Sequence, residues 1–580
     1  MIAATERDKP ESIATCGDER HPERDVSEWI SLRARERPEQ PAVITLGEAN
    51  GSEAASITFA QLDRRVQTYA EHMRAEGLAA GMRVLVMVPP GEDFVALTFA
   101  MFRAGVTPVM IDPGMGVSRM LECVRQVDAQ GFIGVPLAHV VRVLRPSAFR
   151  RVKHLLTVGR RWFWGGGSLR EWRMSNSEYR IGTDAATVMR PEQPYPAAIL
   201  FTSGSTGPAK GVVYEHSMFD AQVRMIQDCY GIEPGEIDVP TFPLFALFSV
   251  AMGMTAVIPR MDASRPARAD PAQIVAAING FGATNSFGSP ALWRRVAAYC
   301  TQRGIKLPTL RRILIAGAPV PWDTISQLHQ ALAPGADVYT PYGATESLPV
   351  SSIGGREVVS QGGDSSGTAM RTRLGHGTCV GRPVAGTQVR IIPIRDEPIE
   401  NWSDDLGLPR GEIGEIVVSG KAVTKEYFGL PSATASAKIR QGAMTWHRVG
   451  DVGYLEESGR IWFCGRKAHR VETAAGTMFT ECCEPVFNEH PRVSRCALVG
   501  VGPRGAQQPV IVVEPSAGHI PRGKAAFREQ LRKLAQANGR TASIRHFLFR
   551  RTLPVDVRHN AKINRELLAA WAAKRIPNVE

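Results

Sequence analysis

The chain has 580 residues, of which 44% are hydrophobic and 22% are charged. This length exceeds what one compact core usually holds, and the composition is that of an ordinary folded protein, which excludes a disordered or fibrous chain. The formal net charge is +12, but basic pairs such as Arg150 and Arg151 are dispersed along the sequence. We therefore expect more than one domain, and a solvated basic surface rather than a nucleic-acid interface.

The cysteine pattern and the N-terminal residues indicate a protein of the reducing cytoplasm. Nine cysteines are scattered from Cys16 to Cys496, without zinc-type C-x-x-C pairs or a regular disulfide pattern. The first ten residues are charged and lack the apolar core of a signal peptide. The longest apolar run, residues 242–258, contains Pro243 and Gly253 and is slightly short for a bilayer, so we expect no transmembrane segment.

Hydrophobic periodicity predicts alternating helices and strands in the first part of the chain. Apolar residues between 62 and 73 recur at helical spacing, and an apolar strand is predicted at residues 83–89. A helix is then expected at residues 92–104 and a further strand at residues 106–111. Strand, helix and strand in this order make a βαβ unit, which implies a parallel sheet.

The same alternation returns further along the chain. A strand is predicted at residues 313–316, a helix at 322–332 and a strand at 337–340. Loops at the carboxyl ends of such strands are the usual ligand sites of α/β proteins. The following segment, residues 353–377, is rich in Gly and Ser, and we expect an exposed, mobile loop there.

Later strands are shorter, as at residues 415–420 and 460–465, and the sequence becomes more β-like. After Gly465 helices and strands alternate again. We predict an α/β fold with a large N-terminal domain, residues 1–465, in which parallel-sheet αβ lobes are joined to a β-rich subdomain. A small α+β C-terminal domain, residues 466–580, is expected to form a mobile lid.

The strongest local motif reads TSGSTGPAKG at residues 202–211, directly after an apolar strand that begins at Ala198. Glycines let the backbone approach a phosphate, hydroxyls and backbone N–H groups donate hydrogen bonds, and a lysine adds positive charge. It is not a Walker A loop, because Ala209 and Gly211 stand where that motif needs Gly and Ser or Thr. The expected phosphate-binding residues are Thr202, Ser203, Gly204, Ser205, Thr206, Gly207 and Lys210.

Further motifs follow this loop in a fixed order. Residues 342–347 read YGATES, residues 446–451 read WHRVGD, and Gly465 with Arg466 precedes a C-terminal lysine, Lys562. In this order the motifs closely resemble those of the acyl-adenylate-forming superfamily, which includes acyl-CoA synthetases, luciferases and peptide-synthetase adenylation domains. The resemblance covers nearly the whole chain, and it implies an enzyme that joins a carboxylic acid to AMP and expels pyrophosphate.

The resemblance also implies a role for each motif residue, with ATP and Mg²⁺ as cofactors. Thr345 would bind the α-phosphate, and Glu346 would hold Mg²⁺, a hard cation that prefers oxygen ligands. Lys562 would contact the substrate carboxylate and stabilise charge as the α-phosphorus is attacked. The residues expected around the adenine and ribose are Gly317, Ala318, Pro319, Tyr342, Gly343, Asp451 and Arg466.

Two departures from the acyl-CoA synthetase pattern bear on the acyl acceptor. Ala246 stands where many of these enzymes carry His, and Ala468 stands where Asp or Lys is common in the hinge. The segments at residues 242–248 and 554–562 resemble the β-lactone synthetases of bacterial long-chain olefin biosynthesis. That branch implies that a long-chain 2-alkyl-3-hydroxy fatty acid is adenylated, and that its own tethered hydroxyl closes a β-lactone.

Other readings stay open from the sequence. The acceptor could instead be external, as in a long-chain fatty-acyl-CoA or acyl-AMP ligase, and a noncatalytic nucleotide-binding scaffold is a third reading. The resemblance further implies a complex with a hydrolase and a dehydrogenase of the pathway. The expected substrate-pocket residues are Phe242, Phe245, Ala246, Phe248, Ser289 and Trp293. The candidate bases for the hydroxyl are His216, His376, His447 and His469.

Overall fold

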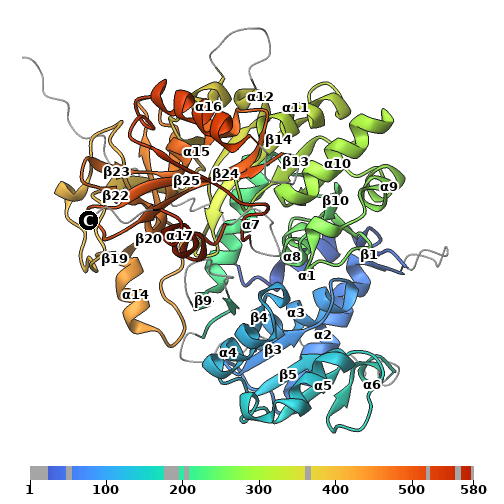
Figure 1. The fold of residues 1–580 in the computed structure, drawn as a ribbon. Helices are drawn as coiled ribbons and strands as arrows, with labels where there is room; N and C mark the ends of the chain where they lie inside the picture. Colours follow the sequence, from blue (N-terminus) through green and yellow to red (C-terminus); the bar gives the residue numbers. More distant parts are fainter. Residues whose placement is uncertain are drawn as a thin grey trace, which may run out of the picture.

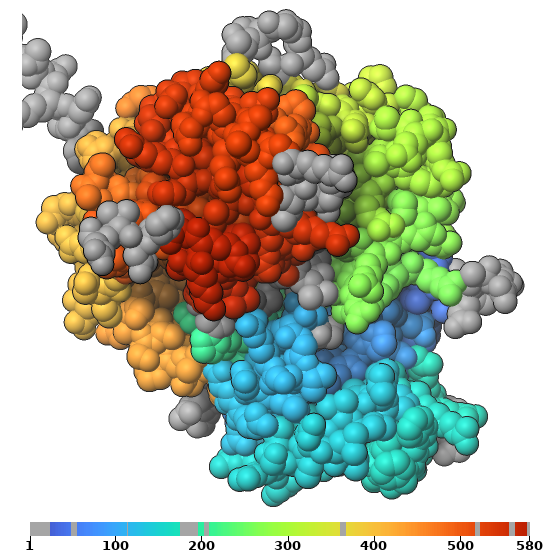
Figure 2. All heavy atoms as spheres, viewed as in Figure 1, coloured from blue at the N-terminus to red at the C-terminus, as the bar shows by residue number. Residues whose placement is uncertain are grey.

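The computed structural model describes residues 24–47, 55–174, 195–201, 208–359, 367–516, 523–555 and 563–576. A large N-terminal domain contains two extended sheets, and a smaller C-terminal domain contains a three-stranded sheet (Figure 1). This arrangement confirms the fold class predicted from the sequence. In Figure 2 the orange and red atoms of the C-terminal domain lie beside the yellow subdomain and the green lobe of the N-terminal domain.

The first sheet has seven strands in the order β7-β6-β5-β3-β4-β8-β9. Its strands pair in parallel, except that β8 and β9 are antiparallel. The predicted βαβ unit is confirmed as β3, α3 and β4. The strands are β3 (Arg83–Met87), β4 (Thr107–Ile111), β5 (Gly131–Gly134), β6 (His154–Thr157), β7 (Gly167–Ser168), β8 (Ala198–Phe201) and β9 (Gly211–Tyr214). The helices of this lobe are α2 (Phe59–Ala75), α3 (Glu92–Ala104), α4 (Val117–Val127), α5 (Pro136–Leu144) and α6 (Leu169–Met174).

The second sheet begins with a parallel lobe, in which β14, β13, β12, β10, β11 and β1 are neighbours. The strands of this lobe are β1 (Pro41–Thr45), β2 (Ala55–Thr58), β10 (Ile237–Pro240), β11 (Thr255–Ile258), β12 (Asn285–Gly288), β13 (Arg312–Ile315) and β14 (Asp337–Ala344). Its helices are α1 (Glu28–Glu36), α7 (His216–Tyr230), α8 (Pro243–Ala251), α9 (Pro271–Phe281), α10 (Pro290–Arg303) and α11 (Trp322–Ala331).

The same sheet continues through antiparallel strands into the predicted β-rich subdomain. These strands are β15 (Ser347–Gly354), β16 (Thr378–Pro383), β17 (Thr387–Ile392), β18 (Gly414–Gly420), β19 (Lys438–Gln441), β20 (Met444–Leu455) and β21 (Ile461–Arg466). The helices here are α12 (Gly355–Val358), α13 (Thr368–Arg373) and α14 (Pro431–Ala437). Residues 353–377 were expected to form one mobile loop, and this is wrong for the described part, which holds α12 and α13.

The C-terminal domain packs three helices against a small sheet. Its central strand β25 pairs with β24 in antiparallel and with β26 in parallel orientation. Its strands are β22 (Val471–Thr473), β23 (Gly476–Met478), β24 (Val493–Val501), β25 (Gln508–Pro515) and β26 (His546–Phe549), and its helices are α15 (Thr480–Asn488), α16 (Lys524–Gln536) and α17 (Arg565–Ala573). The apolar faces of α15 and α16 form one core on the sheet and that of α17 forms another, while Cys482 of α15 packs into a cluster of the β-rich subdomain.

The apolar run at residues 242–258 forms α8 and then the buried strand β11. Gly253, with a φ of 84°, makes the turn between them, a backbone conformation that favours glycine. This confirms the run as core and cavity wall. Among the helices of the described residues, none combines the length and the apolar character that a bilayer span requires.

A buried ion-pair cluster lies close to the predicted end of the N-terminal domain. Glu415 on β18 is fully buried, and its carboxylate lies 2.7 Å from Arg448 Nη2 and 3.0 Å from Lys467 Nζ. Arg448 is on β20, and Lys467 directly follows β21. Gly465, two residues before Lys467, has a φ of 134°, and a Cβ there would collide with the Thr480 hydroxyl at the start of α15. The junction of the two domains is therefore both charged and tightly packed.

Glu415→Ala should destabilise the fold strongly, because it leaves the buried guanidinium of Arg448 without its carboxylate. Loss of one partner of a buried pair costs about 3–5 kcal/mol. Chemical denaturation followed by tryptophan fluorescence measures this change. Glu457→Ala is the matched control, because Glu457 is 86% exposed and 3.9 Å from Arg410, so its loss should cost about 0–1 kcal/mol. Equal effects of the two substitutions would contradict the assignment.

Candidate active site

A cavity of about 2010 Å³ lies where the two lobes and the C-terminal domain meet. Pockets for one small molecule usually have roughly 300–1,000 Å³, so this cavity has room for more than one ligand. Its walls include the carboxyl ends of β13 and β14, which are the predicted ligand-binding positions of a parallel sheet. Apolar side chains of helices α7 and α8 form part of the wall, and α15 contributes residues from the C-terminal domain.

Tyr342, Asp451 and Arg466 form one polar cluster on this wall, although they come from β14, β20 and β21. The Tyr342 hydroxyl donates a hydrogen bond of 2.7 Å to Asp451 Oδ2, and Arg466 Nη1 lies 3.0 Å from Asp451 Oδ1. Burial, then the Asp451 charge, raises the pKa of Tyr342 well above its usual value, so the phenol stays protonated. The Asp451 charge also raises the pKa of Arg466. Other expected nucleotide-binding residues on this wall are Gly317, Ala318, Pro319 and Gly343.

Glu346 is held by residues that lie far away in the sequence. Its Oε1 accepts a hydrogen bond of 2.7 Å from the Tyr427 hydroxyl, and its backbone carbonyl accepts one of 2.9 Å from Thr424 N. The ammonium of Lys210 lies 4.8 Å from the Tyr427 ring centroid, a cation–π contact. Thr345, the neighbouring motif residue, has its carbonyl bonded by the Tyr214 hydroxyl. Thr345 and Glu346 both line the cavity.

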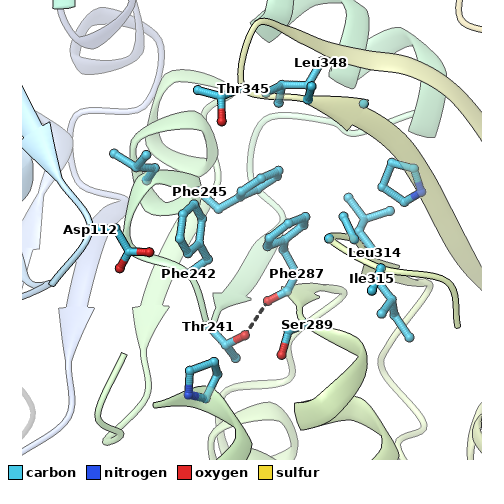
Figure 3. A pocket seen from close by; sticks show the side chains of 18 of the residues that line it. Asp112, Thr241, Phe242, Phe245, Phe287, Ser289, Leu314, Ile315, Thr345 and Leu348 are labelled. Atoms are coloured by element: carbon cyan, nitrogen blue, oxygen red, sulfur yellow. Dashed lines mark hydrogen bonds between the residues drawn. The ribbon is translucent and has the colours of Figure 1, made fainter. Parts of the chain in front are cut away.

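Three phenylalanines lie together in the apolar part of the wall, as Figure 3 shows. The rings of Phe245 and Phe287 are stacked, with centroids 3.4 Å apart and planes 6° from parallel, and Phe242 lies beside them. The Thr241 hydroxyl donates to the Phe287 carbonyl at 2.8 Å, which ties the end of β10 to β12. Phe248 and Ser289 also line the cavity.

Comparison with known proteins identifies the family. Residues 30–428 match the AMP-binding enzyme family. The chain belongs to this family. It is 46% identical to the olefin beta-lactone synthetase of Stenotrophomonas maltophilia, over 94% of this chain and 97% of that one. It is likewise 46% identical to the olefin beta-lactone synthetase of Xanthomonas campestris pv. campestris, over 93% and 96% of the two chains. The family predicted from the sequence motifs is confirmed.

A solved structure shares the fold of the enzyme. The amide bond synthetase McbA from Marinactinospora thermotolerans matches with a TM-score of 0.74 at 22% identity, over 94% of this chain and 99% of that one. At this identity the likeness concerns the fold alone. It covers both domains, which agrees with the α/β class predicted above.

Two expected pocket residues do not reach the cavity. Ala246 is 1% exposed and belongs to the core between the lobes, because its neighbours Phe245 and Leu247 occupy the face of α8 that lines the cavity. Trp293 is fully buried in the core formed by α9, α10 and α11. Apolar residues on one helix divide between core and cavity by their position around the axis, and the sequence does not reveal which side is hollow.

Of the four candidate histidines, His469 lines the cavity. Burial, together with Arg565 and Arg466, lowers the pKa of His469 to about 3, so its ring is neutral. His216 lies 3.2 Å from Asp25 Oδ2, outside the wall. His447 is buried behind it, where burial, then Lys438, lowers its pKa well below the usual value. His376 also lies away from the wall, and burial lowers its pKa.

Some site residues had no signal in the sequence. Lys438 is 6% exposed, and its ammonium donates to the carbonyl of Thr424, which in turn contacts Glu346. Burial lowers the pKa of Lys438 to about 7. Tyr427 and Tyr214 were missed because isolated tyrosines usually belong to the core, and only the folded chain brings their hydroxyls to the motif residues.

Glu481 on α15 was also missed, and it brings an unusual carboxyl to the cavity wall. The Thr378 hydroxyl of the N-terminal domain donates a hydrogen bond of 2.9 Å to its Oε2. Burial, then the neighbouring Glu484, raises the pKa of Glu481 to about 7. Glu484 itself is paired with Arg565, whose Nη1 lies 2.5 Å from Glu484 Oε1. This carboxyl therefore changes its charge near neutral pH, at a contact between the two domains.

The loop residues Thr202, Ser203, Gly204, Ser205, Thr206 and Gly207 lie outside the described residues, and so does Lys562. Their assignments stay predictions.

Because the pKa of Glu481 is raised, the free energy of unfolding should fall as the pH rises from about 4.5, the usual carboxyl pKa, to about 7. In this window the folded state holds a proton that the unfolded state has released, and above it the buried charge is fully unfavourable. Glu481→Gln should therefore raise stability at pH 8, by on the order of 1–3 kcal/mol, and change it little at pH 4.5.

Thermal unfolding at several pH values measures this difference. Glu412→Gln is the control, because Glu412 is exposed and its substitution should leave the pH profile of the wild type intact. A Glu481→Gln variant with the pH dependence of the wild type would show that the carboxyl does not titrate as described.

Proposed function

We propose that this protein is an ATP-dependent olefin β-lactone synthetase. The observation that carries the proposal is the identity of 46% to two proteins of that name, over nearly the whole of each chain. It agrees with the β-lactone synthetase predicted from the sequence. The proposed substrate is a long-chain 2-alkyl-3-hydroxy fatty acid, which is activated with ATP and closed to a β-lactone with release of pyrophosphate and AMP.

The nucleotide would occupy the polar side of the cavity. Tyr342 would stack on the adenine opposite residues 317–319, and Asp451 would accept hydrogen bonds from the ribose hydroxyls. Asp451 suits this role because it is 3% exposed and already oriented by Tyr342 and Arg466. Thr345, with Lys210 and the loop residues before it, would contact the phosphates.

Glu346 is the proposed Mg²⁺ ligand. Within the described residues no three His, Cys, Asp or Glu side chains gather into a metal site, and this fits Mg²⁺, which is commonly bound by one or two carboxylates together with substrate phosphates. The Tyr427 hydroxyl orients the Glu346 carboxylate through a hydrogen bond to Oε1, and Oε2 would be the oxygen offered to the cation. When bound, Mg²⁺ would neutralise phosphate charge.

The proposed reaction has two steps. A carboxylate oxygen of the fatty acid attacks the α-phosphorus, and pyrophosphate leaves with the electrons of the broken P–O bond. The 3-hydroxyl oxygen then attacks the acyl carbon, the bond to AMP breaks, and the hydroxyl proton is released. Because nucleophile and target belong to one molecule, the second step gains from proximity and needs no external acceptor. The stacked rings of Phe245 and Phe287 would keep water away from the acyl carbon.

Lys562 is proposed to stabilise the charge on the bridging oxygen in the first step. It belongs to the C-terminal domain, which we propose begins at residue 466 and closes over the cavity as a lid. We further propose that the enzyme works in the cytoplasm, in lipid metabolism, and that it associates with a hydrolase and a dehydrogenase of the same pathway.

Incubation with Mg-ATP and a 2-alkyl-3-hydroxy fatty acid should give the β-lactone, AMP and pyrophosphate without CoA. Mass spectrometry of the extracted lipids, with and without added CoA, measures the product. The same acid without its 3-hydroxyl is the control and should give no lactone. A CoA thioester as the sole product would replace the proposal with an acyl-CoA ligase.

Lys562→Ala should reduce acid-dependent exchange of labelled pyrophosphate into ATP by about 100-fold or more, because one electrostatic contact to the transition state is lost. Lys574→Ala, at a surface lysine just after α17, is the control and should keep the exchange rate. Unchanged exchange in the Lys562 variant would refute its role. A wild-type protein without any exchange would instead indicate a noncatalytic nucleotide-binding protein.

A further inference from the structure

Helix α7 presents a stripe of side chains to the cavity. Gln222 and Val223 lie three and four residues after Phe219, and Ile226 and Tyr230 continue the same helix face. All five residues line the cavity. Four of these residues are apolar or aromatic, as a wall for alkyl chains requires. Gln222 places a primary amide among them, and it is fully buried in the protein.

The amide of Gln222 lacks a well-formed hydrogen bond. Neither its oxygen nor its nitrogen has a partner of good geometry among the described residues. The hydroxyl of Tyr214 lies beside this amide. Burial raises the pKa of Tyr214, and the contact with the Gln222 amide acts in the opposite direction. Tyr214 has one O–H proton, which it donates to the carbonyl of Thr345. The hydroxyl can therefore only accept from the Gln222 NH₂ group, and the amide oxygen is left without a donor.

A buried amide oxygen without a donor is unfavourable, because folding removes its water and gives nothing in return. A methionine or leucine would fill the same volume at no such cost. The position on the cavity wall offers a reason for the amide, since a bound molecule with an O–H or N–H group would satisfy the oxygen. The apolar neighbours on the stripe would meanwhile contact the hydrocarbon part of that molecule.

The position of Gln222 relative to the motif residues indicates which group of a bound molecule could donate a hydrogen bond to its amide oxygen. Gln222 lies beside the Tyr214 hydroxyl, and that hydroxyl donates to the carbonyl of Thr345, the residue proposed to bind the α-phosphate. The acyl carbon of an adenylate is joined to that phosphate through a single oxygen. A hydroxyl on the third carbon of the acid therefore lies close to the acyl carbon, on the side where the alkyl chains begin.

We propose that Gln222 recognises the 3-hydroxyl of the substrate, with its amide oxygen as the acceptor, and so selects 3-hydroxy acids. This inference rests on the proposed function. Held in this way, the O–H bond points to Gln222, and the oxygen lone pairs are free to face the acyl carbon. Gln222 would be a specificity-determining residue that orients the nucleophile. An amide is too weakly basic to take the proton.

The test compares two acids in the pyrophosphate exchange reaction, a 2-alkyl-3-hydroxy fatty acid and the same acid without the hydroxyl. The wild type should prefer the hydroxy acid in kcat/KM. Gln222→Met keeps the length of the side chain and removes the amide, and it should lower this preference by about tenfold or more, because a site that bonds a hydroxyl discriminates by that bond. The rate with the deoxy acid should fall little.

Val223→Ala is the matched control on the same helix face. It removes apolar contact, so it should lower the rates with both acids and leave their ratio within about twofold. The ratio does not depend on the amount of folded enzyme, since both acids are measured on one preparation. Without substrate, Gln222→Met should melt at the same temperature as the wild type or higher, because it removes an unsatisfied amide.

Two results would overturn the inference. One is a hydroxyl preference that is unchanged in Gln222→Met, or absent from the wild type. The other is a Gln222→Met variant that fails to fold or melts clearly below the wild type, which would make the amide a structural group. Lactone formation by the wild type is scored separately. If lactone forms and the preference is unchanged in the variant, only the role of Gln222 fails, whereas the absence of lactone counts against the proposed function itself.

Discussion

The buried carboxylate of Asp451 is the charge on which the arrangement of the candidate site depends. It lies on β20, accepts the Tyr342 hydroxyl from β14 and pairs with Arg466 at the end of β21. β20 and β21 are neighbouring strands, whereas β14 lies further along the same sheet, so this carboxylate links the motif residue of β14 to the β20–β21 pair. Because Arg466 is also the residue at which we propose that the C-terminal domain begins, the same charge connects the polar side of the cavity to the proposed junction of the two domains.

The cavity combines two environments that substrates of mixed character require. One side carries Tyr342, Glu346 and Asp451, with hydroxyls and carboxylates in fixed directions. The other side carries stacked phenylalanines and the apolar stripe of α7. A long-chain acid has a carboxylate that must meet ATP and chains that must avoid water, so these two sides must meet at the acyl carbon. The Tyr214 hydroxyl, bonded to Thr345 and adjacent to Gln222, lies at that boundary.

Local pattern predicted the regular elements well. The helix at residues 92–104 has the same bounds in the structure, because acidic residues begin it and Gly105 ends it in a left-handed conformation. The segment at 353–377 was misjudged, because Gly and Ser favour a loop locally, whereas burial of Gly355 and Thr368 holds two short helices against the sheet. Of the predicted pocket residues, Phe242, Phe245, Phe248 and Ser289 line the cavity, whereas Ala246 and Trp293 face the core.

By itself, the sequence determined the family, the α/β class and the identity of the motif residues, because phosphate loops and strand ends depend on local backbone chemistry that short motifs encode. Only the tertiary structure decided which side chains support those motifs. Tyr427, Lys438 and Glu481 act on the site through contacts between segments distant in the chain, and their pKa values follow from burial that no local pattern contains. The same holds for Gln222, whose unsatisfied amide becomes visible only when every neighbour is in place.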